Sequence, residues 1–391
     1  MRVEVINHPS GDQLPILLDD DGLPVPMPSE FVLGRRAFGT NTLVRNLREL
    51  TVLYDWLGRE RIDLWDRIST GKAFTEAELR GGLIESLRRD HSKGRKVKRI
   101  VVTPNTFNQR LTTVRQYFGL LFDLYLGSMP HDDIRYERIR DQKMRTISWL
   151  DSSFINAPPI NASKQKGLTL RQARFLVNCL DPENDQAYGR DHAVRFRNYV
   201  SVMIMLNYGL RPGELLSLKV ADIEFGAISA IRITRRPPDQ NDKRSPRPHI
   251  KRNGRVMLID NPIFARHINE YIMKWRDVLE AKSDEESEYL ILSDEGNPLS
   301  QPSLVQFFQL IRKRFPDELP ANLSAKSLRH TFSSNMERVL REAGLDEGRR
   351  EEALADLRGD SSLSSQSVYI AQEIQEQANL AMRNYHSKIL G

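Results

Sequence analysis

The stretch that decides the fold is Asn207–Leu218, NYGLRPGELLSL. It follows an apolar run, Val200–Leu206, which is typical of a buried helix. Gly209 can adopt a backbone turn that other residues avoid, and Pro212 suits the first turn of a helix. The pattern therefore predicts that one helix ends, the chain turns, and a second helix begins directly after Arg211.

Arg211 is the charged residue at this junction between two helices. We expect its guanidinium to lie beside free N–H groups of the second helix, where anions bind well. A guanidinium can bind two phosphate oxygens at once, and Glu214, one turn further on, can brace it. The alternative is an Arg–Glu ion pair that only ties the two helices together.

Two further motifs follow this stretch along the chain. They are Ser324–Thr331, SAKSLRHT, and Leu357–Tyr369, LRGDSSLSSQSVY. In this order, and with a tyrosine at the end, the three motifs resemble the active-site boxes of the tyrosine recombinase (phage integrase-like) family. The resemblance is close over about residues 167–375 and holds only in pattern for the earlier region.

The resemblance implies an enzyme that breaks and rejoins duplex DNA by transesterification. Tyr369 is the expected nucleophile and would form a 3′-phosphotyrosyl intermediate. It lies nine residues after Asp360, the distance at which the family places its tyrosine after the third-box histidine. Arg211 and Arg329 are the expected pair of guanidiniums at the pentavalent phosphorus, so no metal ion or cofactor is expected. A tyrosine in such apolar company would otherwise be assigned to a core.

The general acid for the leaving 5′ oxygen is expected on a β-hairpin. Lys251, in HIKRNGRVMLI, precedes an Asn–Gly turn and a predicted strand, Arg255–Ile259. It is the best match to the hairpin lysine of the family. Lys243 and Arg252 compete for the role, because a polar insertion before the turn blurs the register. A solvated hairpin lysine is the alternative.

Two positions depart from the family pattern. Lys326 replaces the usual second-box histidine; it can donate to a phosphate but shuttles a proton less readily near neutral pH. Asp360 replaces the usual histidine or tryptophan of the third box. Its carboxylate would repel a phosphate unless it is protonated or paired, for example with Arg358. We expect His330 to be structural and to pack behind Arg329.

The composition is that of a soluble protein with more than one domain. The chain has 391 residues, of which 39% are hydrophobic and 28% charged. The net charge of +6 suits a nucleic-acid partner without proving one. Cys179 is the only cysteine, which excludes an intrachain disulfide and a cysteine-based metal site. Without a signal peptide or an apolar membrane segment, we expect a cytoplasmic, nucleoid-associated protein with no membrane partner.

The expected fold is mixed but mainly α-helical, with a small antiparallel β-sheet. Residues 1–29 predict an N-terminal arm made of a strand or hairpin. Residues 30–128 predict a helical domain similar to the core-binding, DNA-binding domain of the family. Residues 129–166, rich in charge and then in Pro, Asn and Ser, predict a linker. Residues 167–391 predict the catalytic domain with a C-terminal docking helix.

After Tyr369, apolar residues recur at helical spacing and must pack against something. In similar recombinases such a segment docks on a neighbouring protomer, so we expect a homo-tetramer on double-stranded DNA, with a possible accessory or partner recombinase. Packing within the same chain is the alternative. The whole pattern predicts a site-specific recombinase or integrase of a mobile element. Two alternatives stay open: a catalytically impaired DNA-binding protein, suggested by Asp360 and Lys326, and a type IB topoisomerase-like enzyme.

Overall fold

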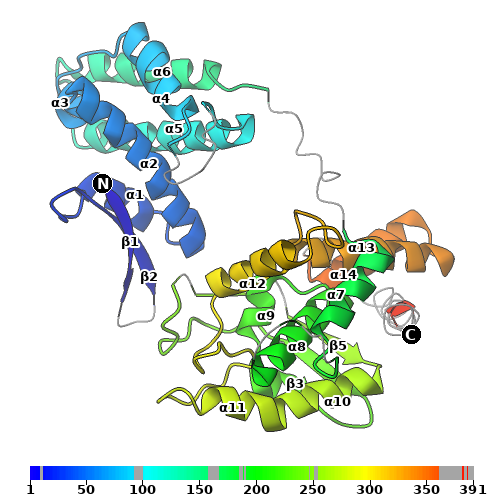
Figure 1. Cartoon of the computed structure of the whole chain (residues 1–391). Helices are drawn as coiled ribbons and strands as arrows, with labels where there is room; N and C mark the ends of the chain where they lie inside the picture. Colours follow the sequence, from blue (N-terminus) through cyan, green and yellow to red (C-terminus); the bar gives the residue numbers. More distant parts are fainter. Residues whose placement is uncertain are drawn as a thin grey trace. The chain divides into compact units, whose positions relative to one another are not determined.

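The chain forms two compact units, residues 1–161 and 162–391, in the computed structural model. Both are mainly helical, and among the described residues each contains one small antiparallel sheet (Figure 1). This confirms the predicted fold class. The described residues are 1–8, 12–91, 100–156, 167–184, 188, 191–245, 247–250, 254–360, 381–382 and 385.

The first unit begins with a β-hairpin. Strands β1 (Arg2–Asn7) and β2 (Gln13–Leu18) pair antiparallel. The hairpin predicted within residues 1–29 is present, but it packs on the unit rather than projecting as an arm, since Leu17 is fully buried in the core. Helix α1 (Pro26–Leu33) already begins inside the predicted arm, with proline in its first turn.

The remaining helices of this unit enclose one apolar core. The two longest are α2 (Thr40–Glu60) and α5 (Pro104–Gly127), and Leu47 of α2 and Phe118 of α5 are fully buried. The helices expected between residues 30 and 128 are therefore present. The shorter members are α3 (Leu64–Ser69), η1 (Ala77–Ile84) and α4 (Glu85–Arg88).

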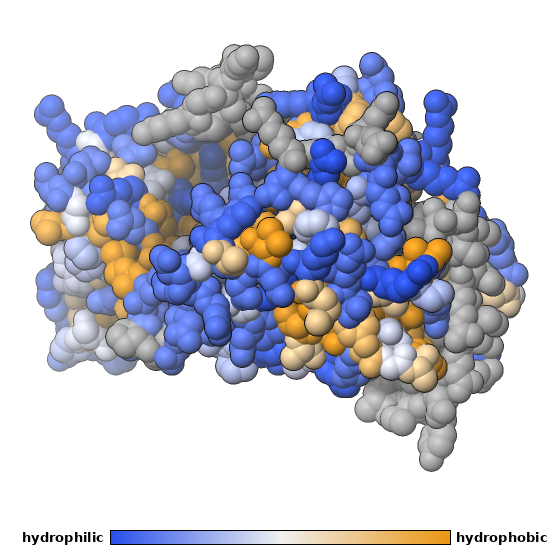
Figure 2. Space-filling model, turned by 60° about the horizontal axis from the view of Figure 1, so that its bottom comes forward, coloured by the Kyte–Doolittle hydropathy of each residue, from blue (hydrophilic) through white to orange (hydrophobic). Residues whose placement is uncertain are grey.

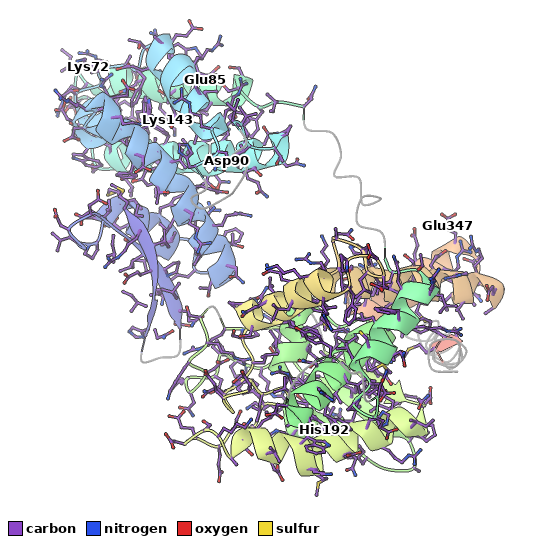
Figure 3. The ribbon with its side chains drawn as sticks, in the orientation of Figure 1. Lys72, Glu85, Asp90, Lys143, His192 and Glu347 are labelled. Atoms are coloured by element: carbon purple, nitrogen blue, oxygen red, sulfur yellow. The ribbon has the colours of Figure 1, made fainter. Side chains whose placement is uncertain are left out.

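The prediction of a linker over residues 129–166 is wrong for helix α6 (Tyr136–Ser152). Leu150 of α6 is fully buried in the core of the first unit. Lys143, labelled in Figure 3, forms an ion pair with Asp123 of α5. The sequence of α6 is YERIRDQKMRTISWLDS. Its apolar residues are separated by many charged ones, so the local pattern did not indicate a helix that packs in a core.

Helix α8 (His192–Tyr208) is the centre of the second unit. Every residue from Phe196 to Tyr208 is buried. It packs against α7 (Leu170–Leu180), α9 (Pro212–Ser217) and α13 (Ala325–Glu342), of which α7 and α9 lie beside it in Figure 1. The apolar run before the Arg211 junction is thus a core helix, as predicted.

The sheet of the second unit has three described strands, β3 (Ile223–Glu224), β4 (Ser229–Ile233) and β5 (Arg255–Ile259), in that spatial order. All neighbours are antiparallel, and Arg255 at the start of β5 lies opposite Ile233 at the end of β4. The strand predicted over residues 255–259 is confirmed. The polar β4–β5 connection, residues 234–254, therefore leaves and rejoins this three-stranded sheet at the same end of its strands.

The described residues after position 360 pack in the core of the second unit. Of the residues after 360, the described ones (Ala381, Met382 and Tyr385) are buried in this unit's own core, and Tyr385 donates to the Leu206 carbonyl oxygen (3.0 Å). These three residues pack within their own chain, which is the alternative to docking on a neighbour. The remaining helices are η3 (Val220–Asp222), α10 (Pro262–Glu270), η4 (Tyr271–Arg276), α11 (Asp277–Glu280), α12 (Gln301–Arg314) and α14 (Glu347–Arg358).

The surface is mainly polar. On the face drawn in Figure 2, hydrophilic residues predominate and apolar side chains form separate patches between them. Within the part of the chain that the structure describes, no helix is both long enough and apolar enough to cross a membrane.

Candidate active site

The junction before Arg211 is built as predicted. Gly209 ends α8 with φ of +62°, in the left-handed region, and a Cβ atom there would lie 2.3 Å from Cδ1 of Phe332. Glycine is therefore required for both conformation and space. Pro212 opens α9 and Arg211 is its N-cap residue. The turn thus brings Arg211 to the start of a helix.

Glu214 holds Arg211 from two directions. Arg211 Nη1 donates to Oε1 of Glu214 (2.8 Å), and the Arg211 backbone N–H donates to Oε2 (2.9 Å). The Glu214 side chain is only 1% exposed, whereas that of Arg211 is 26% exposed. The predicted contact between Glu214 and Arg211 is present, and Nη2 of Arg211 contacts Asp360 instead.

Arg329 is placed by α13, whose first turn is capped by Ser324. Its Nη1 atom donates to the Gly209 carbonyl oxygen (2.7 Å), so the second motif contacts the turn of the first. Burial, reinforced by the nearby cations Arg211 and Arg358, lowers the pKa of Arg329 to about 10. The side chain is still a cation at neutral pH.

Arg211 and Arg329 meet at the C-terminal end of α14. The carbonyl oxygen of Arg358, the last residue of that helix, accepts from Arg211 Nη1 (3.1 Å) and from Arg329 Nη2 (3.0 Å). The free carbonyl groups at a helix C-terminus carry partial negative charge and favour cations. The third motif therefore supplies a backbone acceptor that fixes the two guanidiniums side by side.

The carboxylate of Asp360 lies where these cations converge. Its Oδ1 atom accepts from Nη2 of Arg211 and lies 3.3 Å from Nη2 of Arg329. Oδ2 forms an ion pair with Nη2 of Arg358 at 3.0 Å. Asp360 is therefore paired, as its departure from the family pattern requires, and Arg358 is one of the partners. The arginines of the first and second motifs thus converge on one carboxylate, that of Asp360.

A further arginine, which we did not predict from the sequence, lies on the other side of Glu214. Arg255 of β5 donates from Nη2 to Oε2 (3.1 Å) and from Nη1 to Oε1 (3.4 Å). Burial alone would raise the pKa of Glu214, but Arg255 and then Arg211 hold that pKa below its ordinary value. Arg255 faces inward in phase with Met257 and Ile259. An arginine at a core-facing strand position was the signal in the sequence.

The other second-motif residues lie on the same helix. Lys326 is exposed, and His330, one turn further along α13, is partly buried. Burial, followed by the charges of Lys326, Arg358 and Arg329, lowers the pKa of His330. His330 is thus neutral near pH 7, which agrees with a structural role better than with a cationic one.

Lys251, Arg252 and Tyr369 lie outside the described residues. On one side of Lys251, Ile250 is buried, and the His249 carbonyl oxygen would lie 2.9 Å from a Cβ atom on Gly213, in the first turn of α9. Immediately before Lys251, the chain therefore lies against the first turn of α9, which directly follows Arg211.

The competing Lys243 is held elsewhere. Its Nζ atom pairs with Glu285 at 2.5 Å, and its side chain is 78% exposed. The next residue, Arg244, is buried and donates to the carbonyl oxygens of Leu216 (2.8 Å) and Leu299 (3.0 Å). These contacts anchor the early part of the β4–β5 connection to the body of the unit.

Residues 183–373 match the phage integrase family model, a span that contains the three motifs' Arg211, Arg329, Asp360 and Tyr369. No curated protein matches the sequence. Among solved structures, the XerH site-specific recombinase bound to palindromic difH substrate in a post-cleavage complex shares 15% identity over 83% of this chain and 94% of that one, with a TM-score of 0.39. The Tn1549 transposon integrase in complex with circular intermediate DNA shares 16% identity over 69% and 79%, with a TM-score of 0.38.

Proposed function

Because this chain carries a phage integrase domain of the tyrosine recombinase family over residues 183–373, we propose that it is a site-specific recombinase or integrase of a mobile element. It cleaves and rejoins duplex DNA through a 3′-phosphotyrosyl bond at Tyr369. The observation that carries the proposal is the convergence of Arg211 and Arg329 on one carboxylate oxygen of Asp360. Two guanidiniums from distant motifs thereby form one anion site.

In the cleavage step, the Tyr369 oxygen loses its proton to solvent and attacks the scissile phosphorus, and the bond to the 5′ oxygen breaks. Arg211 and Arg329 donate to the non-bridging oxygens as negative charge builds on them; one preorganised donor of this kind is worth about 2.7–4 kcal/mol. Lys251 gives its proton to the leaving 5′ oxygen. In rejoining, a 5′ hydroxyl attacks the phosphorus, gives its proton to Lys251 and displaces the Tyr369 phenolate, which takes a proton back from solvent.

Asp360 has to leave the anion site before the phosphate can enter. Phosphate and carboxylate carry the same sign of charge, so they do not share the two guanidiniums. The Asp360 side chain is 28% exposed, and its second oxygen is held by Arg358, whose side chain is 36% exposed. Asp360 therefore moves outward together with Arg358 and stays paired while the phosphate takes its place.

Lys251 is preferred to Lys243 as the general acid for a structural reason. The chain before Lys251 lies against Gly213, two residues after Arg211, whereas Lys243 is engaged with Glu285 at the surface. Lys326, which is exposed on α13, is a further cation that donates to the phosphate.

The partners follow from the same proposal. The substrate is double-stranded DNA, held by the catalytic domain and by the helical first unit, and the active assembly is a homo-tetramer with or without an accessory or partner recombinase. The protein acts at the nucleoid in the cytoplasm. The basic run at residues 91–99, which lies largely outside the described residues, would contribute phosphate contacts.

A catalytically impaired DNA-binding protein is the second candidate, and Asp360 in the anion site is the observation that favours it. The two are separated by covalent trapping in EDTA, with a nicked suicide duplex from the DNA that flanks the gene. We expect a covalent adduct with the wild type and none with Tyr369→Phe. DNA binding without an adduct would overturn the enzymatic proposal, and relaxation of supercoils without paired sites would indicate a topoisomerase instead.

A further inference from the structure

Glu214 is contacted by three arginines that come from three different elements. Arg211 reaches it from the start of α9 and Arg255 from β5 through both oxygens, and Nη1 of Arg329 on α13 lies 4.0 Å from Oε2. The Arg255 contact is a forked pair, with two roughly parallel hydrogen bonds. The three arginines therefore share Glu214 as an acceptor, and two of them, Arg211 and Arg329, also contact Asp360.

The three arginines differ in where their charge is directed. Arg211 and Arg329 also face the anion site, where both contact Asp360. Arg255 donates to Glu214 and, within the described part of the chain, shows no contact with Asp360. When a phosphate binds Arg211 and Arg329, Arg255 is the arginine that keeps both of its hydrogen bonds to Glu214.

Arg255 also lies close to Gly359 of the third motif. Gly359, which follows α14 with φ of +59°, has its backbone so close that a Cβ atom would lie 2.5 Å from Nη1 of Arg255. Asp356 of α14 is a further charged group near this guanidinium. Arg255 thus contacts Glu214 of the first motif and the turn that carries Asp360, four residues after Lys251.

We infer that Arg255 is a positioning residue of the site, whose guanidinium keeps the Glu214 carboxylate in place under Arg211 while Arg211 binds the scissile phosphate. The inference rests on the proposed function. A carboxylate that is 1% exposed is costly unless paired, and losing its partner favours protonation. A protonated Glu214 offers Arg211 a weaker acceptor, and Arg211 then loses its orientation.

The test is the pH dependence of cleavage by Arg255→Gln. Single-turnover cleavage of the nicked suicide duplex is measured at saturating DNA between about pH 6 and pH 8.5, and each rate is divided by the wild-type rate. Removing Arg255 removes the largest attraction that lowers the pKa of Glu214, so that pKa rises. Since Glu214 is ionised above its pKa, we expect the ratio to rise about tenfold from the acid to the alkaline end.

Two further variants test whether the pH dependence comes from the action of Arg255 on the Glu214 carboxyl group. Arg255→Lys keeps the charge but cannot donate as a fork, so its ratio should be flat with pH and lowered about threefold, with unchanged DNA affinity. Arg255→Gln combined with Glu214→Gln lacks the Glu214 carboxyl group whose titration is proposed to cause the slope, so its ratio should also be flat. Should Arg255→Gln fail to fold, Arg255→Lys decides alone, and a wild-type rate would refute the inference.

Arg276→Gln is the matched control. The Arg276 side chain is 7% exposed, against 6% for Arg255, and it forms an ion pair with Glu280 at 2.8 Å. We expect a ratio that does not vary with pH. A flat ratio for Arg255→Gln, or the same slope in Arg276→Gln, would show that Arg255 has only a structural role. Absence of cleavage by the wild type would instead refute the proposed function.

Discussion

Arg211 and Asp360, which are 149 residues apart in the chain, form an ion pair in the second unit. The pair joins the first motif to the third. Arg329 and Arg358 contact the same carboxyl group. The guanidiniums of the proposed phosphate site therefore pair with a carboxylate of the protein itself, and we expect a DNA phosphate to compete with it.

Asp360→Asn should make it easier for a DNA phosphate to bind to Arg211 and Arg329. The amide keeps the size of the side chain and removes its charge, so we expect DNA to bind about threefold to tenfold more tightly, a change of about 0.7–1.4 kcal/mol. Gel-shift titrations at one fixed salt concentration measure the effect. Asp284→Asn, an exposed residue beyond α11, makes the same change in net charge. Equal tightening in both variants would attribute the effect to overall charge rather than to the site.

Lys251→Ala should slow cleavage by about 10²- to 10⁴-fold on an ordinary duplex, the usual worth of a general acid. A substrate with sulfur at the scissile 5′ position has a leaving group that needs no proton, so it should restore most of the rate. Lys243→Ala is the control, since that lysine pairs with Glu285, and it should cleave both substrates like the wild type. A Lys251→Ala defect that the sulfur substrate does not correct would contradict the assignment.

Glu214→Gln should destabilise the second unit by about 3–5 kcal/mol near neutral pH, because buried arginines lose their counter-charge. The folded-state pKa of Glu214 lies below the ordinary value of 4.5. Its contribution is therefore complete above that value and is lost as the pH falls through the lower, folded-state pKa. Urea unfolding at pH 7 and at about pH 3 should show the gap between wild type and variant narrowing in acid. A gap of constant size would disprove the linkage.

Gly209→Ala should unfold more easily and cleave poorly. The methyl group meets Phe332 and the residue has φ of +62°, a strain on the order of 1–3 kcal/mol. Gly119→Ala is the control, because Gly119 lies within α5 with open space around its Cβ position. That substitution should leave stability unchanged or raise it by up to about 1 kcal/mol. Thermal unfolding of both variants compares them directly.

The sequence was most informative where neighbouring residues determine the structure. The turn at Gly209, the helix start at Pro212 and the contact from Glu214 to Arg211 all lie within six residues, so turn and capping chemistry could predict them. From the charge of Asp360 alone we expected it to be protonated or paired, for example with Arg358. Both expectations were confirmed.

Other features depend on residues that are distant in the chain. Arg255 binds Glu214 across a separation of 41 residues, and a strand pattern shows that it faces inward but not what it meets. Helix α6 buries Ile139 and Leu150 in a core formed by the earlier helices, while seven of its own 17 residues are charged. Neither contact could be deduced from local pattern, because each depends on how separate elements pack.

The carbonyl oxygen of Arg358, which accepts from both Arg211 and Arg329, belongs to the main chain, so any amino acid at that position provides it. Mutation of the side chain cannot delete this acceptor; only a change in the path of the backbone can. Side chains beside it, including that of position 360, can therefore change without removing this acceptor, because the alignment of the two guanidiniums depends on the shape of a helix end.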